Sequence, residues 1–219
     1  MSDVVAYELL LHEWRSLASQ TQSEATRWEH ELAQIADEEG TLRAAGHWVH
    51  GRSDSLAIIG KQRDELVHSR MIGWLLDPCG HHRIGASLLQ AVLARVGIPV
   101  PSPTALARAR VRLEVPIAQG RMDIVVEAPQ LYLVIENKVD ALEGDGQCAY
   151  YSEHVTHPYR QFIFLTPDGR APRDAPEFHR LSYPDLADTI AATLSGSRAP
   201  SAASHVAAEY LRTLRLEFP

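Results

Sequence analysis

Residues 121–138 constrain the fold more than any other part of the chain, because their pattern is that of a β-hairpin. Two apolar runs, residues 124–126 and 131–135, flank the sequence Ala-Pro-Gln at 128–130. Short apolar runs on either side of such a segment are typical of two strands joined by a turn. The stretch therefore predicts an antiparallel strand pair in an α/β protein.

The expected register of this hairpin brings charged side chains together. A turn centred between residues 129 and 130 places Asp123 opposite Glu136. Opposed residues lie about 5 Å apart, and side chains alternate between the two faces of a strand, so Lys138 shares the face of Asp123 and Glu136. Two carboxylates this close repel each other unless a cation lies between them. Their hard oxygen atoms suit Mg²⁺ or Mn²⁺.

The lysine of this group is unusual for the chain. There are 21 basic residues, but only Lys61 and Lys138 are lysine. A lysine inside the charged group is therefore hard to explain as a generic surface charge, and an ammonium differs from a guanidinium in reach and hydration. The alternative is a strand-end lysine that forms a plain ion pair with Glu136.

The spacing resembles the D-x(n)-(E/D)-x-K motif of the PD-(D/E)XK nuclease superfamily, with Asp123 followed by Glu136, Asn137 and Lys138. Further residues resemble other parts of that superfamily. Gln147 and Tyr151 form a Q-x-x-x-Y sequence like that of RecB-like members. Segments upstream resemble the front end of a branch with uncharacterised and defence-associated members: Glu65-Leu-Val-His-Ser69, Trp74-Leu-Leu-Asp-Pro78, His82-Arg-Ile-Gly85 and Leu88-Leu89. The resemblance runs from about residue 65 to 183.

The resemblance implies a restriction-endonuclease-like αβββαβ core, with a mixed sheet flanked by helices, and metal-dependent hydrolysis of phosphodiester bonds. It implies catalytic roles for Asp123, Glu136, Lys138 and Glu65. It also implies a Mg²⁺ or Mn²⁺ site formed by Asp123, Glu136, Glu65 and the carbonyl of Asn137. The resemblance further implies that substrate is bound by Gln147, Tyr151, Ser69 and His82.

Several of these residues have simpler explanations that the sequence leaves open. Glu65 would also be favourable in the first turn of a helix, where the helix dipole attracts an acid. Gln147 fits a helix surface, Tyr151 fits a core position, and His82 fits a plain loop histidine. Glu114 matches a glutamate of the same branch, or a half-buried strand acid paired with an arginine.

The net charge of −7 is unusual for a nucleic-acid-binding protein, which normally has a basic surface. Its distribution reduces the difficulty, because residues 1–45 hold nine acids and three bases, whereas residues 46–219 hold nineteen and eighteen. The body is thus close to neutral and rich in arginine, which is compatible with DNA but does not demand it. DNA is expected as the substrate in preference to RNA. No apolar run approaches the ~20 residues of a membrane span, and two cysteines form no disulfide framework, so a cytoplasmic location is expected.

The acidic N-terminal part, residues 1–46, is predicted to be a helical segment separate from a nuclease-like domain of residues 47–219. Apolar residues recur there at spacings of three and four, a stripe that would pack on the body, on a second copy or on another protein. Gly40 is expected to end the helix and Thr41 to cap a short one. The stripe comprises Leu10, Trp14, Leu17, Thr21, Ala25, Trp28, Leu32 and Ile35.

The body is predicted to follow a helix–strand–strand–strand–helix–strand order. One helix is expected to begin within residues 54–64 and run to 76, with Glu65 and Ser69 on its inner face. The other expected helices are 84–96, 147–154, 183–194 and 202–216, with a linker at 195–204. The expected strands are 111–116, 122–127, 131–138, 160–166 and 179–182.

Three functions are consistent with these patterns. The first is a metal-dependent nuclease acting on DNA, in phage defence or DNA processing. The second is a nuclease-fold module that binds a partner or a nucleotide without catalytic activity of its own. The third is an unrelated α/β interaction domain.

Overall fold

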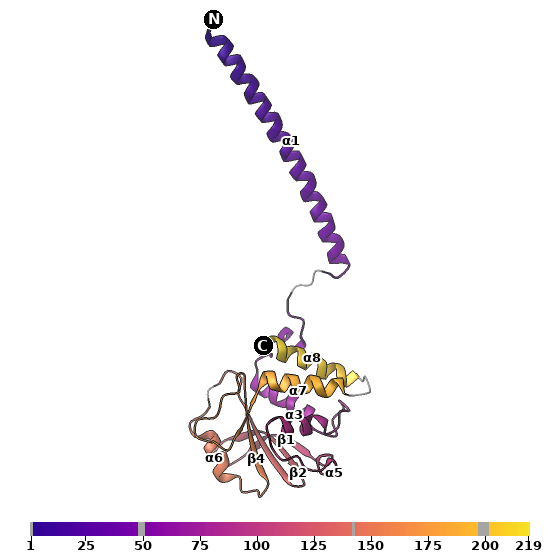
Figure 1. Cartoon of the computed structure of the whole chain (residues 1–219), viewed down its shortest axis with the longest axis vertical. Coiled ribbons are helices and arrows are strands. Elements are labelled where there is room, and N and C mark those ends of the chain that lie inside the picture. Colours follow the sequence, from indigo (N-terminus) through magenta and orange to yellow (C-terminus); the bar gives the residue numbers. More distant parts are fainter. Residues whose placement is uncertain (1, 48–50, 142, 197–201) are drawn as a thin grey trace. The chain divides into compact units, whose positions relative to one another are not determined.

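The structure is a computed structural model that describes residues 2–47, 51–141, 143–196 and 202–219. The chain divides into two compact units, Met1–Gly51 and Arg52–Pro219 (Figure 1). Each unit is described by itself. The first holds one long helix, and the second holds a sheet with helices packed on it.

Helix α1, Ser2–Ala44, is 43 residues long and lies in the N-terminal unit. The prediction that Gly40 ends this helix is wrong, because the helix continues through Gly40 to Ala44. A glycine inside a helix costs only about 1 kcal/mol relative to alanine, which the flanking turns can tolerate. The helix ends instead just before Gly46, whose φ of +75° is left-handed and whose N–H donates to the carbonyl of Arg43.

The body contains a five-stranded mixed sheet in the order β1-β2-β3-β4-β5. β1, β2 and β3 pair antiparallel, whereas β3, β4 and β5 pair parallel. The predicted mixed sheet flanked by helices is therefore confirmed. The strands are β1 Arg110–Pro116, β2 Arg121–Ala128, β3 Leu131–Asn137, β4 Arg160–Thr166 and β5 His179–Ser182.

The hairpin of β2 and β3 has the predicted register. Ala128 lies opposite Leu131, and Ile124 lies opposite Ile135, so the next residues outward are Asp123 and Glu136. The turn is tight, and it includes a left-handed residue, Gln130, with φ of +64°. The apolar runs and the turn thus fix which side chains meet at the open end of the hairpin.

Both faces of the sheet are covered, which explains why β3 is apolar almost throughout. One face is covered by α3 Glu65–Leu76 and α7 Tyr183–Ser195, and α4 Ser87–Arg95 and α8 Ala202–Glu217 pack on α7 in the same apolar core. The other face carries α6, Gln147–His154, through a smaller cluster with Val125, Val134, Cys148 and Tyr151 (Figure 1). Consecutive residues of β3 therefore face two different cores.

The helix predicted to reach residue 76 is divided in two. A short helix, α2, covers Ser55–Ile58 and is followed by Gly60, whose φ of +68° lies outside the right-handed helical region. A new helix, α3, then begins after Asp64, whose carboxylate accepts from the N–H of Val67. This cap places Glu65 in the first turn of α3 rather than within a longer helix.

The remaining helices agree closely with the predicted ranges. A further short helix, α5 Pro103–Leu106, lies between α4 and β1. The predicted linker 195–204 includes residues 197–201, which lie outside the residues that the structure describes.

Candidate active site

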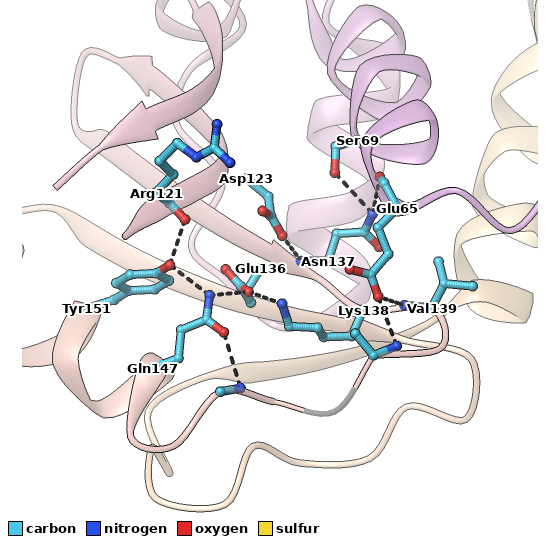
Figure 2. Close-up of polar contacts among 12 residues, drawn as sticks. Glu65, Ser69, Arg121, Asp123, Glu136, Asn137, Lys138, Val139, Gln147 and Tyr151 are labelled. Atoms are coloured by element: carbon cyan, nitrogen blue, oxygen red, sulfur yellow. Dashed lines mark hydrogen bonds and ion pairs between the residues drawn. The ribbon is translucent and has the colours of Figure 1, made fainter. Parts of the chain in front are cut away.

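The predicted charged group gathers where β2 begins and β3 ends (Figure 2). Glu136 is fully buried, and its Oε1 accepts from Lys138 Nζ at 2.7 Å and from Gln147 Nε2 at 2.6 Å. Its second oxygen, Oε2, is buried and has no hydrogen-bond partner among the described residues. Asp123 lies alongside, and its Oδ2 accepts from the backbone N–H of Asn137 at 2.8 Å.

Gln147 and Tyr151 form a chain of hydrogen bonds that fixes Glu136. Gln147 Nε2 also donates to the Tyr151 hydroxyl at 2.8 Å, and that hydroxyl donates to the carbonyl of Arg121 at 2.6 Å. Because the two residues are one helical turn apart on α6, the Q-x-x-x-Y spacing aims both at the start of β2 and the end of β3 (Figure 2). In this structure Gln147 contacts the motif glutamate directly, whereas Tyr151 reaches it only through Gln147. Their predicted contact with substrate stays a prediction.

Glu65 approaches the group from α3. Its Oε1 accepts from the backbone N–H groups of Val139 at 2.8 Å and Ala141 at 3.2 Å. An ion pair between Arg63 and Asp140 at 2.5 Å ties the same two segments together. Glu65 therefore holds the backbone that follows Lys138, in addition to contributing negative charge near Asp123 and Glu136.

Asn137 points to the opposite face of the sheet from Glu136. Its Nδ2 donates to the carbonyl of Glu65 and to the hydroxyl of Ser69, both at 3.0 Å. Its Oδ1 accepts from the hydroxyl of Tyr183 at 2.6 Å. The side chain thus links β3 to α3 and α7, a role that the sequence did not predict. Ser69 is buried in this contact, and its predicted role in substrate binding stays a prediction.

Burial and mutual repulsion control the protonation of the two motif carboxyls. Burial raises the pKa of Asp123 to about 6, against the opposing effects of the Asn137 N–H and Lys138. Burial, followed by repulsion from Asp123, raises the pKa of Glu136 to about 8. Burial opposes the charge of Lys138, but attraction to Glu136 outweighs it and raises the pKa of the ammonium. The lysine is therefore a permanent positive charge beside two carboxyls that resist ionising together.

The donor set fits a divalent cation, although the acidic side chains are engaged with protein donors. Within the described part of the chain, no group of three histidine, cysteine, aspartate or glutamate side chains is already arranged around a metal position. The unpartnered Oε2 of Glu136, with Asp123 on the adjacent strand, is the feature that suits a cation. A cation there would offset the repulsion that raises both pKa values.

Two other sequence candidates lie in defined surroundings. His82 is buried; its imidazole contacts the carbonyl of Asp77 and accepts from the N–H of Ile84, which fixes the loop before α4. Burial lowers its pKa. Its predicted role in substrate binding stays a prediction.

Glu114 lies on β1 with a positive φ of +52°, rare for a residue with a side chain. It forms an ion pair with Arg121 at 3.2 Å, which is one of the two alternatives for this residue. Its negative charge also adds to the repulsion that raises the pKa of Asp123.

The model of the PD-(D/E)XK nuclease superfamily matches residues 53–212. Searches of curated proteins and of solved structures found no match. None of the helices in the described residues is long and apolar enough to cross a membrane.

Proposed function

The chain belongs to the PD-(D/E)XK nuclease superfamily, and we propose that it is a Mg²⁺- or Mn²⁺-dependent nuclease that cleaves DNA. The reaction is hydrolysis of a phosphodiester bond. We further propose that it serves phage defence or DNA processing in the cytoplasm.

One observation carries the proposal: a fully buried glutamate keeps one oxygen without a partner, beside the half-buried carboxyl of Asp123 and a lysine. An unpaired buried carboxylate oxygen is costly, so this oxygen does not stabilise the fold. The same oxygen is useful if a cation binds there. The side chains involved are those of the D…E-x-K motif on which the superfamily is defined.

Each residue of the group has a proposed role. Asp123 and Glu136 would hold the cation, with Glu65 and the Asn137 carbonyl as further ligands. When bound, the ion supplies Lewis-acid polarisation and lowers the pKa of a water. Lys138, positive at the edge of the site, orients a water or stabilises the negative charge that develops on the phosphate. Gln147 and Tyr151 keep Glu136 in place by the hydrogen bonds described above.

The second candidate is a nuclease-fold module that binds a partner or nucleotide and does not cleave. It is favoured by the contacts of Glu136 and Glu65, whose Oε1 atoms are both already occupied by donors of the protein. In this case the charged group would be a structural ion-pair network. Only a measurement of cleavage separates this possibility from the nuclease.

The test is incubation of the purified full-length chain with plasmid, linear DNA and RNA, each with Mg²⁺, Mn²⁺ or EDTA. We expect cleavage of DNA with either metal and none with EDTA. Asp123→Asn should abolish it. Asp37→Asn is the matched control, since it makes the same change at an exposed carboxylate of α1, in the other unit of the chain. Metal-independent cleavage, or full activity of Asp123→Asn, would contradict the proposal.

A further inference from the structure

Helix α1 presents a continuous apolar stripe to solvent within its own unit. Trp14 and Trp28 are 70% and 57% exposed, and Leu10, Leu17, Leu32 and Ile35 are each about 60% exposed. Exposed apolar side chains scattered singly are ordinary, but a contiguous stripe marks an interaction surface. Most of the stability of helices in proteins comes from packing of an apolar face rather than from helix propensity, so this 43-residue helix would gain stability if the stripe were covered.

The stripe has the seven-residue repeat of a coiled-coil seam. Five residues recur at intervals of seven: Trp14, Thr21, Trp28, Ile35 and Leu42. In the first half each is preceded by an apolar residue four positions earlier, namely Leu10 and Leu17. In the second half the preceding residue lies three positions earlier: Ala25 and Leu32 are apolar, whereas Glu39, before Leu42, is an acid that accepts from Arg43. This single shift of phase is a stutter, which locally unwinds a coiled coil without interrupting its seam.

The two edges of the seam differ in charge. One edge carries Glu13, Gln20, Glu24, Glu31 and Glu38. The opposite edge carries Leu11, Ala18, Glu29, Ala36 and Arg43. The first edge therefore has four acids, and the second has one acid and one base.

This asymmetry discriminates between the ways in which a second copy can lie along the seam. In a parallel pair, a two-fold axis along the helices sets the acidic edge of one copy against the nearly uncharged edge of the other. In an antiparallel pair the acidic edges face each other, so four glutamates from each copy repel. Charges on the edges of a seam set partner choice and orientation in coiled coils.

We propose that α1 is a parallel self-association helix that joins two copies of this chain through the seam from Leu10 to Leu42. The tryptophans, leucines and Ile35 become buried between the copies. Thr21 is compatible with the seam because its hydroxyl already donates to the carbonyl of Leu17, which leaves its methyl group for packing. The assignment is independent of the proposed nuclease activity, since it rests on α1 alone.

The first test is the mass of the full-length chain by sedimentation or light scattering over a range of concentrations. We expect twice the chain mass of 24.3 kDa. Leu17→Glu should shift the mass to that of one chain. Ser19→Glu is the matched control, because it adds the same charge to α1 on the face away from the seam and should keep the dimer. A single-chain mass for the unmodified protein, or an equal effect of both variants, would overturn the proposal.

The second test concerns direction. In a parallel pair Thr21 meets Thr21, so Thr21→Cys in a Cys79→Ser background should form an interchain disulfide on mild oxidation. Cys79 is removed because it is exposed, while Cys148 is buried. Thr26→Cys, on the opposite face of α1, should not cross-link. A Thr21→Cys dimer by mass that fails to cross-link would indicate the antiparallel pair and overturn the parallel one.

Discussion

Glu136 and Asn137 are adjacent in β3 and equally buried, yet their surroundings differ in kind. On one face of the sheet, each polar atom of the Asn137 side chain has a partner, supplied by Glu65, Ser69 and Tyr183. On the other face, Glu136 retains a buried oxygen without a partner. Its pKa is also raised to about 8 by burial and by Asp123.

The difference distinguishes a structural polar site from one that is suited to a ligand. A satisfied buried network stabilises and specifies the packing around it. A buried carboxyl that lacks a partner and resists ionisation weakens the metal-free fold and instead suits a ligand that brings positive charge. The α6 face of the strand end is therefore the candidate for chemistry, and the α3 face is its support.

The largest expected effect comes from Glu136→Gln. The variant keeps the shape of the side chain but loses the charge that would hold the cation, so cleavage of DNA should fall to the background rate. Activity is to be measured at saturating Mg²⁺, with metal affinity followed separately by calorimetry. Activity within a few-fold of the unmodified protein would show that this face is not the site.

Lys138→Ala should reduce the rate by roughly 100-fold or more, the scale of losing a contact to the transition state. Metal affinity should be largely kept, because Asp123 and Glu136 remain. Lys138→Arg should not restore the rate, since a guanidinium differs from an ammonium in reach and hydration. Lys61→Ala, which removes the other lysine of the chain, is the control. Full recovery by Lys138→Arg would argue for a plain ion pair.

Asn137→Ala tests the structural face. It removes three hydrogen bonds and leaves the hydroxyl of the buried Tyr183 unpaired, which should lower the free energy of unfolding by about 3 kcal/mol. Urea unfolding in EDTA, followed by near-ultraviolet circular dichroism, measures the change. Below the unfolding transition, the rate per folded molecule should fall far less than in Glu136→Gln. An unchanged unfolding midpoint would contradict the assigned role.

A further prediction concerns the pH dependence of stability without metal. A carboxyl whose pKa is higher in the folded state contributes stability at low pH that is lost as pH rises. With folded values of about 6 for Asp123 and about 8 for Glu136, the free energy of unfolding in EDTA should fall between about pH 4 and pH 8. Glu136→Gln should flatten this decline, whereas Asn137→Ala should keep its slope. A rise in stability over the same range from these groups would contradict the raised pKa values.

The two units of the chain also differ in what their sequences reveal. In the body, the turn at residues 128–130 determines the register of the hairpin, because pairing propagates from a tight turn one residue at a time. The opposition of Asp123 and Glu136 was therefore predictable. In α1, a repeat of three and four residues determines a helix with one apolar face, but the end of that helix was misplaced. Gly40 was interpreted as a stop, although the left-handed conformation occurs at Gly46.

Other features depended on contacts between distant segments. The predicted helix up to residue 76 is divided at Gly60 because Asp64 begins a new helix beside the sheet, and local pattern does not distinguish these outcomes. The partners of Asn137 lie 46 and 68 or more positions away in the chain. The role of Glu65 also depends on contacts between distant segments. The sequence places Glu65 in the acidic group, and only the structure shows that its carboxylate accepts a hydrogen bond from the backbone after Lys138.

The sequence by itself determined the order of elements, the hairpin register and the identity of the charged residues at its open end. These depend on local turns and on periodicity, which act over a few residues. Only the tertiary structure decided that Gln147 and Lys138 share one oxygen of Glu136 and leave the other unpaired. That arrangement requires α6 to pack on one face of the sheet and α3 on the other, and a linear pattern contains no information about such distances.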